Sequence, residues 1–231
     1  MDTFHNLAPI GPHSKLIIVG KREPFCRIQD EKASTRKLTG FFKFASALTG
    51  HASQVRLPRR KGFDAEAVLG VVIGKRAERV TTAQSLDYVG GFTLLLDITD
   101  REAFDKEGKT NNCLFAKNHR SLTPIGPRTW VPPDFQDVQL GHVTLRQNGA
   151  VRQRFDLDDL AYGIEEVVAY WSRVGLEPGD VLGLGAAIVS DCLKDFETPV
   201  VIGAGDSIEL EASPIGVLKI EIVEPNATSE V

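Results

Sequence analysis

Apolar residues recur along most of the chain in short runs that are typical of β-strands. Val68–Ile73 reads VLGVVI and Phe92–Thr99 reads FTLLLDIT, and unbroken aliphatic runs of this length indicate buried strands. Lys15–Gly20 reads KLIIVG, a β-branched run closed by glycine, which also predicts a strand. The same signals predict further strands at Phe41–Leu48, Val181–Gly185, Ser207–Glu211 and Ile215–Val223.

Helical patterns are rare in the chain. Apolar residues at helical spacing predict one long helix at Leu157–Val174, with Asp158 or Asp159 near its start and Gly175 as its stop. A shorter helical pattern follows a threonine cap at Thr81–Tyr88. One long helix among about ten short strands predicts a mainly β protein of the α+β class, and it excludes a doubly wound nucleotide-binding fold.

Turn and loop signals separate these elements. Val138–Gln147 and Ala150–Arg154 alternate around Asn148-Gly149, which is the strongest short signal for a β-hairpin. Residues 176–180 read LEPGD and predict a turn, and the charged stretch Asp100–Asn112 predicts a loop.

Composition and charge narrow the classes of function. The 231 residues are 42% hydrophobic, which is enough for one large domain with a substantial core, since mixed-β domains often reach roughly 250 residues. The chain has 27 basic and 31 acidic residues and a net charge of -4, which argues against a nucleic-acid partner. No apolar stretch approaches the roughly 18 residues of a membrane span. We therefore expect a small-molecule substrate, with no nucleic acid and no membrane as partner.

The cysteines and the first residues indicate a cytoplasmic protein. Cys26, Cys113 and Cys192 are odd in number and lack metal-ligand spacing, so neither a disulfide framework nor a zinc site is expected. Residues 1–20 lack the continuous apolar core of a secretory signal.

Four ordered segments resemble the fumarylacetoacetate hydrolase family. They are EAVLGVVIGKRAERVTTAQSLDYVGGFTLLLDITDRE (66–102), LFAKNHRSLTPIGP (114–127), LEPGDVLGLG (176–185) and GAGDSIELEASPIGVLKIEI (203–222). The resemblance extends from Lys43 to about Val223. It implies a mixed β-sandwich roll or coiled β-barrel like the C-terminal domain of that family, and a homodimer. It divides the chain into a lead-in strand with a lid-like segment (1–40), a catalytic domain (41–223) and a disordered tail (224–231).

The resemblance also implies a chemistry. Members use Mg²⁺ or Mn²⁺ to bind a 2-oxo acid or a 1,3-dicarbonyl compound, and the metal stabilises an enolate. Their three carboxylate ligands fall on Glu66, Val68 and Asp97 here, so the second ligand is missing. A local bulge could instead pair Asp64 with Glu66. With two carboxylates, Mg²⁺ could still bind through water and substrate oxygens, but weakly.

Other positions of the family pattern also differ. The His and Glu of the lid fall on Cys26 and Gln29, and the threonine-glycine-threonine loop falls on Leu184, Gly185 and Ala186. The lid groups that would activate water and the hydroxyl groups of the loop are therefore absent.

The basic residues of the pattern are retained. Lys43, Arg101 and Lys117 match family positions and become candidate substrate-binding groups, together with Gly185. His119 lies close to Lys117 along the chain and is a candidate acid or base, since the pKa of histidine lies near neutrality. We therefore take Lys117, His119 and Glu66 as candidate catalytic residues, and Glu66 and Asp97 as candidate metal ligands. Structural ion pairs, exposed side chains or a snorkelling Lys43 remain the alternatives.

Three functions fit this set. The first is enolate chemistry on a small oxo acid or dicarbonyl compound without the full metal site, namely decarboxylation, dehydration, tautomerisation or cyclisation. The second is an ordinary Mg²⁺- or Mn²⁺-dependent carbon-carbon hydrolase or decarboxylase. The third is a catalytically silent partner subunit or binding protein.

Overall fold

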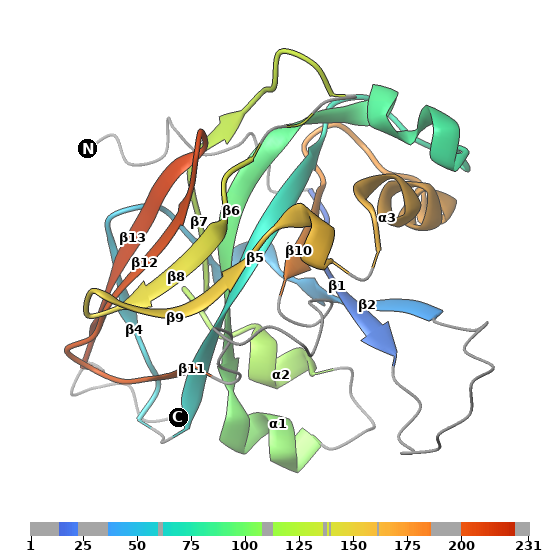
Figure 1. Cartoon of the computed structure of the whole chain (residues 1–231). Coiled ribbons are helices and arrows are strands. Elements are labelled where there is room, and N and C mark those ends of the chain that lie inside the picture. Colours follow the sequence, from blue (N-terminus) through green and yellow to red (C-terminus); the bar gives the residue numbers. More distant parts are fainter. Residues whose placement is uncertain are drawn as a thin grey trace, which may run out of the picture.

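Two β-sheets packed face to face form the body of the protein (Figure 1). The computed structural model describes residues 14–22, 37–59, 62–107, 113–135, 138, 140–160, 162–185 and 200–224. Within these ranges the larger sheet has eight strands, in the order β2 (Lys37–Lys43), β1 (Leu16–Arg22), β10 (Val181–Gly185), β5 (Phe63–Ile73), β6 (Val89–Asp100), β7 (Thr123–Trp130) and β3 (Leu48–Thr49), with β11 (Val200–Ile202) paired to β5. The second described sheet has the order β4 (Ser53–Arg56), β13 (Gly216–Val223), β12 (Ser207–Ala212), β8 (Val143–Gln147) and β9 (Ala150–Phe155).

Strand alternation explains why the two sheets pack together. Leu69, Leu94 and Leu96 point from the larger sheet into a cluster that also contains Leu145 and Leu218 of the smaller one, and all five are fully buried. Each buried leucine side chain stabilises the fold by about 1.5–3 kcal/mol relative to its exposed form. Because this shared core covers one face of β5 and β6, polar side chains on these strands can gather only on the opposite face.

The larger sheet is strongly coiled. A second, smaller apolar cluster on its other face contains Val68 and Leu95 from the central strands, and Phe41 of β2 and Leu48 of β3 pack against it. Because β2 and β3 are the two ends of the strand order, the sheet curls until both ends reach one cluster. The expected mainly β, coiled fold is confirmed.

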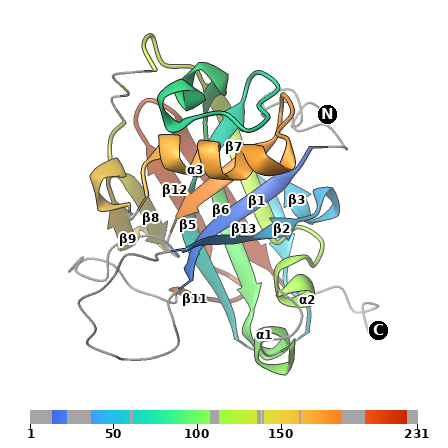
Figure 2. The same cartoon turned by 90° about the vertical axis from the view of Figure 1, so that its right-hand side faces the viewer.

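Helices cover the two ends of the larger sheet. α1 (Arg101–Glu107) and α2 (Leu114–Lys117) lie at one end and α3 (Ile164–Trp171) at the other, as both views show (Figures 1 and 2). No helix within the described ranges has the length and apolarity needed to cross a membrane.

The single long helix predicted at Leu157–Val174 is wrong. The chain instead forms a 3₁₀ turn at Leu157–Asp159, then α3, then a second 3₁₀ turn at Ser172–Val174. Two N-terminal caps interrupt the pattern, because Asp159 accepts a hydrogen bond from the backbone of Asp156 and Glu166 accepts one from Gly163.

Two further elements differ from the prediction. The loop predicted from Asp100 contains α1, whose start is capped by the Asp100 carboxylate accepting from Ala103 N at 2.9 Å. The strand predicted at Phe41–Leu48 is broken by a 3₁₀ turn at Ala45–Ala47. The hairpin at Asn148-Gly149 is confirmed, with both residues at positive φ.

Gly185 ends β10 where no side chain fits. It pairs with Val68 of β5, and a Cβ atom at position 185 would lie 2.4 Å from the Ala67 carbonyl oxygen and 2.7 Å from Val68 Cγ2. We expect Gly185→Ala to lower the free energy of unfolding by about 1–3 kcal/mol, because backbone must shift to admit the methyl group. Gly203→Ala is the matched control, since no atom lies within 4 Å of its Cβ position. Equal midpoints of urea denaturation for the two variants would contradict this packing.

Candidate active site

The register of β5 and β6 places the candidate acids side by side. The two strands pair without interruption from Phe63 to Val72, and Glu66 lies directly opposite Asp97. Directly opposed residues share a face, with Cβ atoms about 4.5–5.5 Å apart. Asp64 and Thr99 form the next pair on that face. A bulge is therefore not needed to bring Asp64 beside Glu66, although Asp64 has a different partner, described below.

The third family ligand position belongs to an apolar cluster. Val68 is 1% exposed and packs with Leu95, Ile125 and Val181 on the same face as the acids. Its two methyl groups lie over Gly183 and Gly185, where added Cβ atoms would approach within 2.9 and 2.7 Å. The missing ligand is thus replaced by closely packed hydrocarbon.

Two lysines neutralise Asp97. Lys43 Nζ lies 2.8 Å from Asp97 Oδ1, and Lys117 Nζ lies 2.6 Å from Oδ2. Lys117 comes from the short helix α2 and also donates to Thr99 Oγ1 at 2.6 Å. Burial of such ions is unfavourable unless charge and hydrogen bonds are both satisfied. The two lysines balance the charge of Asp97, and Lys117 donates to its Oδ2, whereas Oδ1 faces Lys43 as an ion pair without a hydrogen bond.

The two lysines differ in how many of their N–H groups are bonded to an acceptor. Lys43 Nζ also donates to the carbonyl of Lys117 at 2.6 Å and lies 3.4 Å from that of Ile98, so its hydrogen-bonding capacity is filled by the protein. Of the three N–H groups on Lys117 Nζ, Asp97 and Thr99 accept two. The carboxylate of Glu66, at 3.9 Å, is too distant to accept the third. Among the described residues, no acceptor is bonded to that third N–H.

Burial and neighbouring charges shift the pKa values of the ionisable groups in different directions. Burial lowers the pKa of Lys43 to about 8, despite the charge of Asp97. Burial also opposes ionisation of Lys117 and Asp97, but their mutual attraction outweighs it, so the pKa of Lys117 is raised and that of Asp97 is lowered. Burial raises the pKa of Glu66, with Lys117 opposing the change. Glu66 is consequently the carboxylate best suited to gain and lose a proton.

Arg101 joins the cluster through an acid that the sequence analysis did not select. Its guanidinium is hydrogen-bonded to Asp64, which is 1% exposed, and stacks over the ring of Phe104 with 5.2 Å from Cζ to the ring centroid. When all are ionised, three cations (Lys43, Arg101, Lys117) balance three carboxylates (Asp64, Glu66, Asp97). The sequence analysis named Asp64 only as an alternative metal-binding partner of Glu66, whereas Thr99 could have been found from strand alternation because it lies two positions from Asp97.

His119 has a separate partner. Its Nε2 lies 3.3 Å from Asp100 Oδ2, and Asp100 also caps α1. Asp100 is three residues beyond Asp97 on the same strand, so its side chain points to the opposite face of the sheet. Gly185 lies beside Val68, at the apolar edge of the cluster. Cys26, Gln29 and Ala186 lie outside the described residues.

The cluster does not suit a divalent metal ion. A carboxylate site requires free oxygen ligands, whereas both oxygens of Asp97 face ammonium groups and Val68 supplies no donor. The ammonium of Lys117 already lies between Asp97 and Glu66. Within the described ranges, no three or more His, Cys, Asp or Glu side chains are grouped to hold a metal.

The comparisons with known proteins agree with this fold. The family model of the fumarylacetoacetate (FAA) hydrolase C-terminal domain matches residues 19–223. The chain therefore belongs to the fumarylacetoacetate hydrolase family and is an enzyme of that family.

Three similar proteins indicate the range of activities. Oxaloacetate tautomerase Fahd2a, mitochondrial, of Rattus norvegicus is 28% identical over 94% of this chain and 69% of its own length. The crystal structure of a 5-carboxymethyl-2-hydroxymuconate delta-isomerase from Mycobacterium smegmatis has a TM-score of 0.77 and 27% identity, covering 96% of this chain and 82% of that one. A fumarylpyruvate hydrolase from Pseudomonas aeruginosa, solved with Mn²⁺ and pyruvate, has a TM-score of 0.74 at 21% identity, covering 91% and 89%, and supports the fold alone.

Asp97 should be the residue on which the cluster's stability depends. We expect Asp97→Asn to lower the free energy of unfolding by about 3–5 kcal/mol, because two buried ammonium groups lose their shared counter-charge. Adding Lys43→Met should recover part of that loss, since one uncompensated cation is removed. Urea denaturation of the two single variants and the double variant measures the coupling. Strictly additive losses would show that Lys43 and Asp97 do not interact.

Proposed function

We propose that this enzyme interconverts the keto and enol forms of a small 2-oxo acid without a metal ion. The observation that supports it is the position of Lys117 Nζ, which lies 2.6 Å from Asp97 and 3.9 Å from Glu66 and, among the described residues, has two bonded acceptors for its three N–H groups. A carbonyl oxygen bound there would receive a hydrogen bond from a buried cation, and that bond strengthens as the oxygen becomes an enolate.

Glu66 supplies the proton transfer. Its carboxylate takes a proton from the carbon next to the carbonyl, which leaves an enolate and a protonated Glu66. The raised pKa of Glu66 allows it then to return the proton to the enolate oxygen, so that the substrate becomes the enol and the enzyme is unchanged. Asp97 balances the charge of Lys117 and fixes its ammonium group, and Lys43 pairs with the other oxygen of Asp97 and donates to the backbone carbonyl of Lys117.

Two of the similar proteins support this reaction. A tautomerase and a delta-isomerase move protons within one molecule and consume no water. The lid groups expected to activate water are replaced by Cys26 and Gln29 in the sequence. Decarboxylation and the other enolate reactions share the same oxyanion and are the related alternatives. A homodimer remains a prediction, which the molecular mass in solution would test.

The test is keto-enol conversion of oxaloacetate, followed by the ultraviolet absorbance of the enol. We expect turnover to survive exhaustive chelation with EDTA and to gain nothing from added Mn²⁺. Lys117→Met should lower kcat/KM by about 10²–10³-fold, because the oxyanion loses its donor. Lys106→Met is the matched control, since its ammonium pairs with Glu102 on the surface of α1.

Two outcomes would overturn the proposal. Activity lost to EDTA and restored by Mn²⁺ would assign an ordinary metal-dependent enzyme. Absence of turnover on oxaloacetate and on a panel of other 2-oxo acids would instead favour a silent partner or binding protein.

The pH dependence follows from Lys43. With a pKa of about 8, Lys43 loses its proton above that pH, and the cluster then carries one uncompensated negative charge that disfavours the enolate. We expect kcat/KM to fall as pH rises through about 8. In Lys43→Met this fall in kcat/KM near pH 8 should be absent, whatever the absolute rate of the variant. A wild-type profile that stays flat to pH 10 would contradict the role of Lys43.

A further inference from the structure

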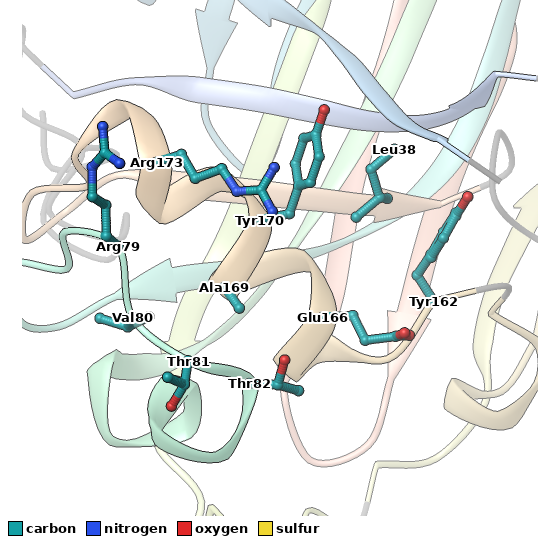
Figure 3. A pocket seen from close by; sticks show the side chains of 10 residues that line it. All are labelled: Leu38, Arg79, Val80, Thr81, Thr82, Tyr162, Glu166, Ala169, Tyr170 and Arg173. Carbon is teal, nitrogen blue, oxygen red and sulfur yellow. The ribbon is translucent and has the colours of Figure 1, made fainter. Parts of the chain in front are cut away.

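A second candidate binding site lies at the other end of the larger sheet. An open cavity of about 730 Å³, with Arg79, Glu166 and Arg173 exposed at its surface, lies between α3, the 3₁₀ helix at Thr82–Tyr88 and the start of β2 (Figure 3). None of its lining residues belongs to the charge cluster, whose Arg101 and Lys117 are on α1 and α2, and Figure 1 shows these two helices at the other end of the sheet from α3. Its volume falls within the range of about 300–1,000 Å³ that is typical of small-molecule sites.

One wall of the cavity is cationic. Arg79 and Arg173 both line it, and within the described part of the chain neither has a carboxylate in ion-pairing distance. The backbone brings them together, because Arg79 N donates to the carbonyl of Ser172 at 3.0 Å, next to Arg173. Arg79 adopts a left-handed conformation with φ of 51° to do so, which is uncommon for a residue other than glycine. Two guanidinium groups on one wall favour a carboxylate or phosphate ligand.

The rest of the lining is aromatic, apolar and acidic. The guanidinium of Arg173 stacks over Tyr170 at 5.0 Å, and Leu38 lies on the same side. Glu166 lies near Tyr162, on the side away from Arg79 (Figure 3). Glu166 Oε2 accepts the cap hydrogen bond from Gly163 at 3.0 Å, and among described residues Oε1 has no such bond. The far side therefore accepts a hydrogen-bond donor.

We propose that this cavity binds a planar organic acid whose anionic group meets Arg79 and Arg173 and whose other end donates a hydrogen bond to Glu166. The arginines supply charge-assisted hydrogen bonds, Tyr170 and Leu38 cover the flat apolar body, and Glu166 selects for the donor. The site is separate from the charge cluster and does not depend on the reaction proposed above.

The test uses three matched probes with the full-length protein. 4-Hydroxybenzoate has the anion, the ring and the donor; benzoate lacks the donor; and 4-hydroxybenzamide lacks the charge. We expect 4-hydroxybenzoate to bind with one saturable site by calorimetry, and 4-hydroxybenzamide to bind at least tenfold more weakly. Arg79→Gln and Arg173→Gln should each weaken 4-hydroxybenzoate at least fivefold. Glu166→Gln keeps an acceptor for the Gly163 cap and should reduce the preference for 4-hydroxybenzoate over benzoate.

Two controls locate the binding. Arg76→Gln removes an exposed arginine outside the cavity and should leave affinity unchanged. Lys117→Met should also leave it unchanged, because the charge cluster lies elsewhere. Equal weakening by Arg76→Gln would show non-specific attraction to surface arginines, and loss of binding in Lys117→Met would place the ligand in the charge cluster. Either result, or no binding of 4-hydroxybenzoate, would overturn the proposal.

Discussion

The ion pairing of the buried Asp97 with two ammonium groups is the interaction on which the rest of the site depends. Asp97 is 1% exposed within a strand of nearly continuous apolar residues, where an unpaired carboxylate would be strongly destabilising. Lys43 arrives from β2 and Lys117 from α2, which are distant in sequence. The pairs can form only if the sheet curls and α2 docks against β6, so the fold and the charge cluster require one another.

Replacement of one acid by valine changes what the remaining groups can do. With Val68 in the apolar cluster, Glu66 and Asp97 are the carboxylates left at the positions that the family pattern marks, and Lys117 Nζ lies 3.9 and 2.6 Å from them. An ammonium carries one charge and three directional donors, so it stabilises an oxyanion less strongly than a divalent cation. The enolisation proposed above develops its charge on one oxygen, which a single ammonium group could contact.

The sequence predicted the strands better than the helices, and the acids better than their partners. The runs around Val68 and Leu95 predicted buried strands, because strands of a coiled sheet are covered on both faces. The long helix was wrong because the caps at Asp156 and Gly163 act locally and outweigh a continuous apolar period. The Asp64–Arg101 pair was missed, since side-chain contacts across the cluster depend on how α1 begins at the end of β6.

The same geometry explains why the pKa values of Glu66 and Asp97 shift in opposite directions. The two carboxylates are directly opposed, yet Asp97 receives both ammonium groups at close range whereas Lys117 Nζ stays 3.9 Å from Glu66. Attraction therefore holds Asp97 ionised, while burial raises the pKa of Glu66 and favours proton exchange. Two directly opposed acids thus differ in the way that the proposed reaction requires: Asp97 holds the cations in place, and Glu66 has the raised pKa of a group that could move a proton.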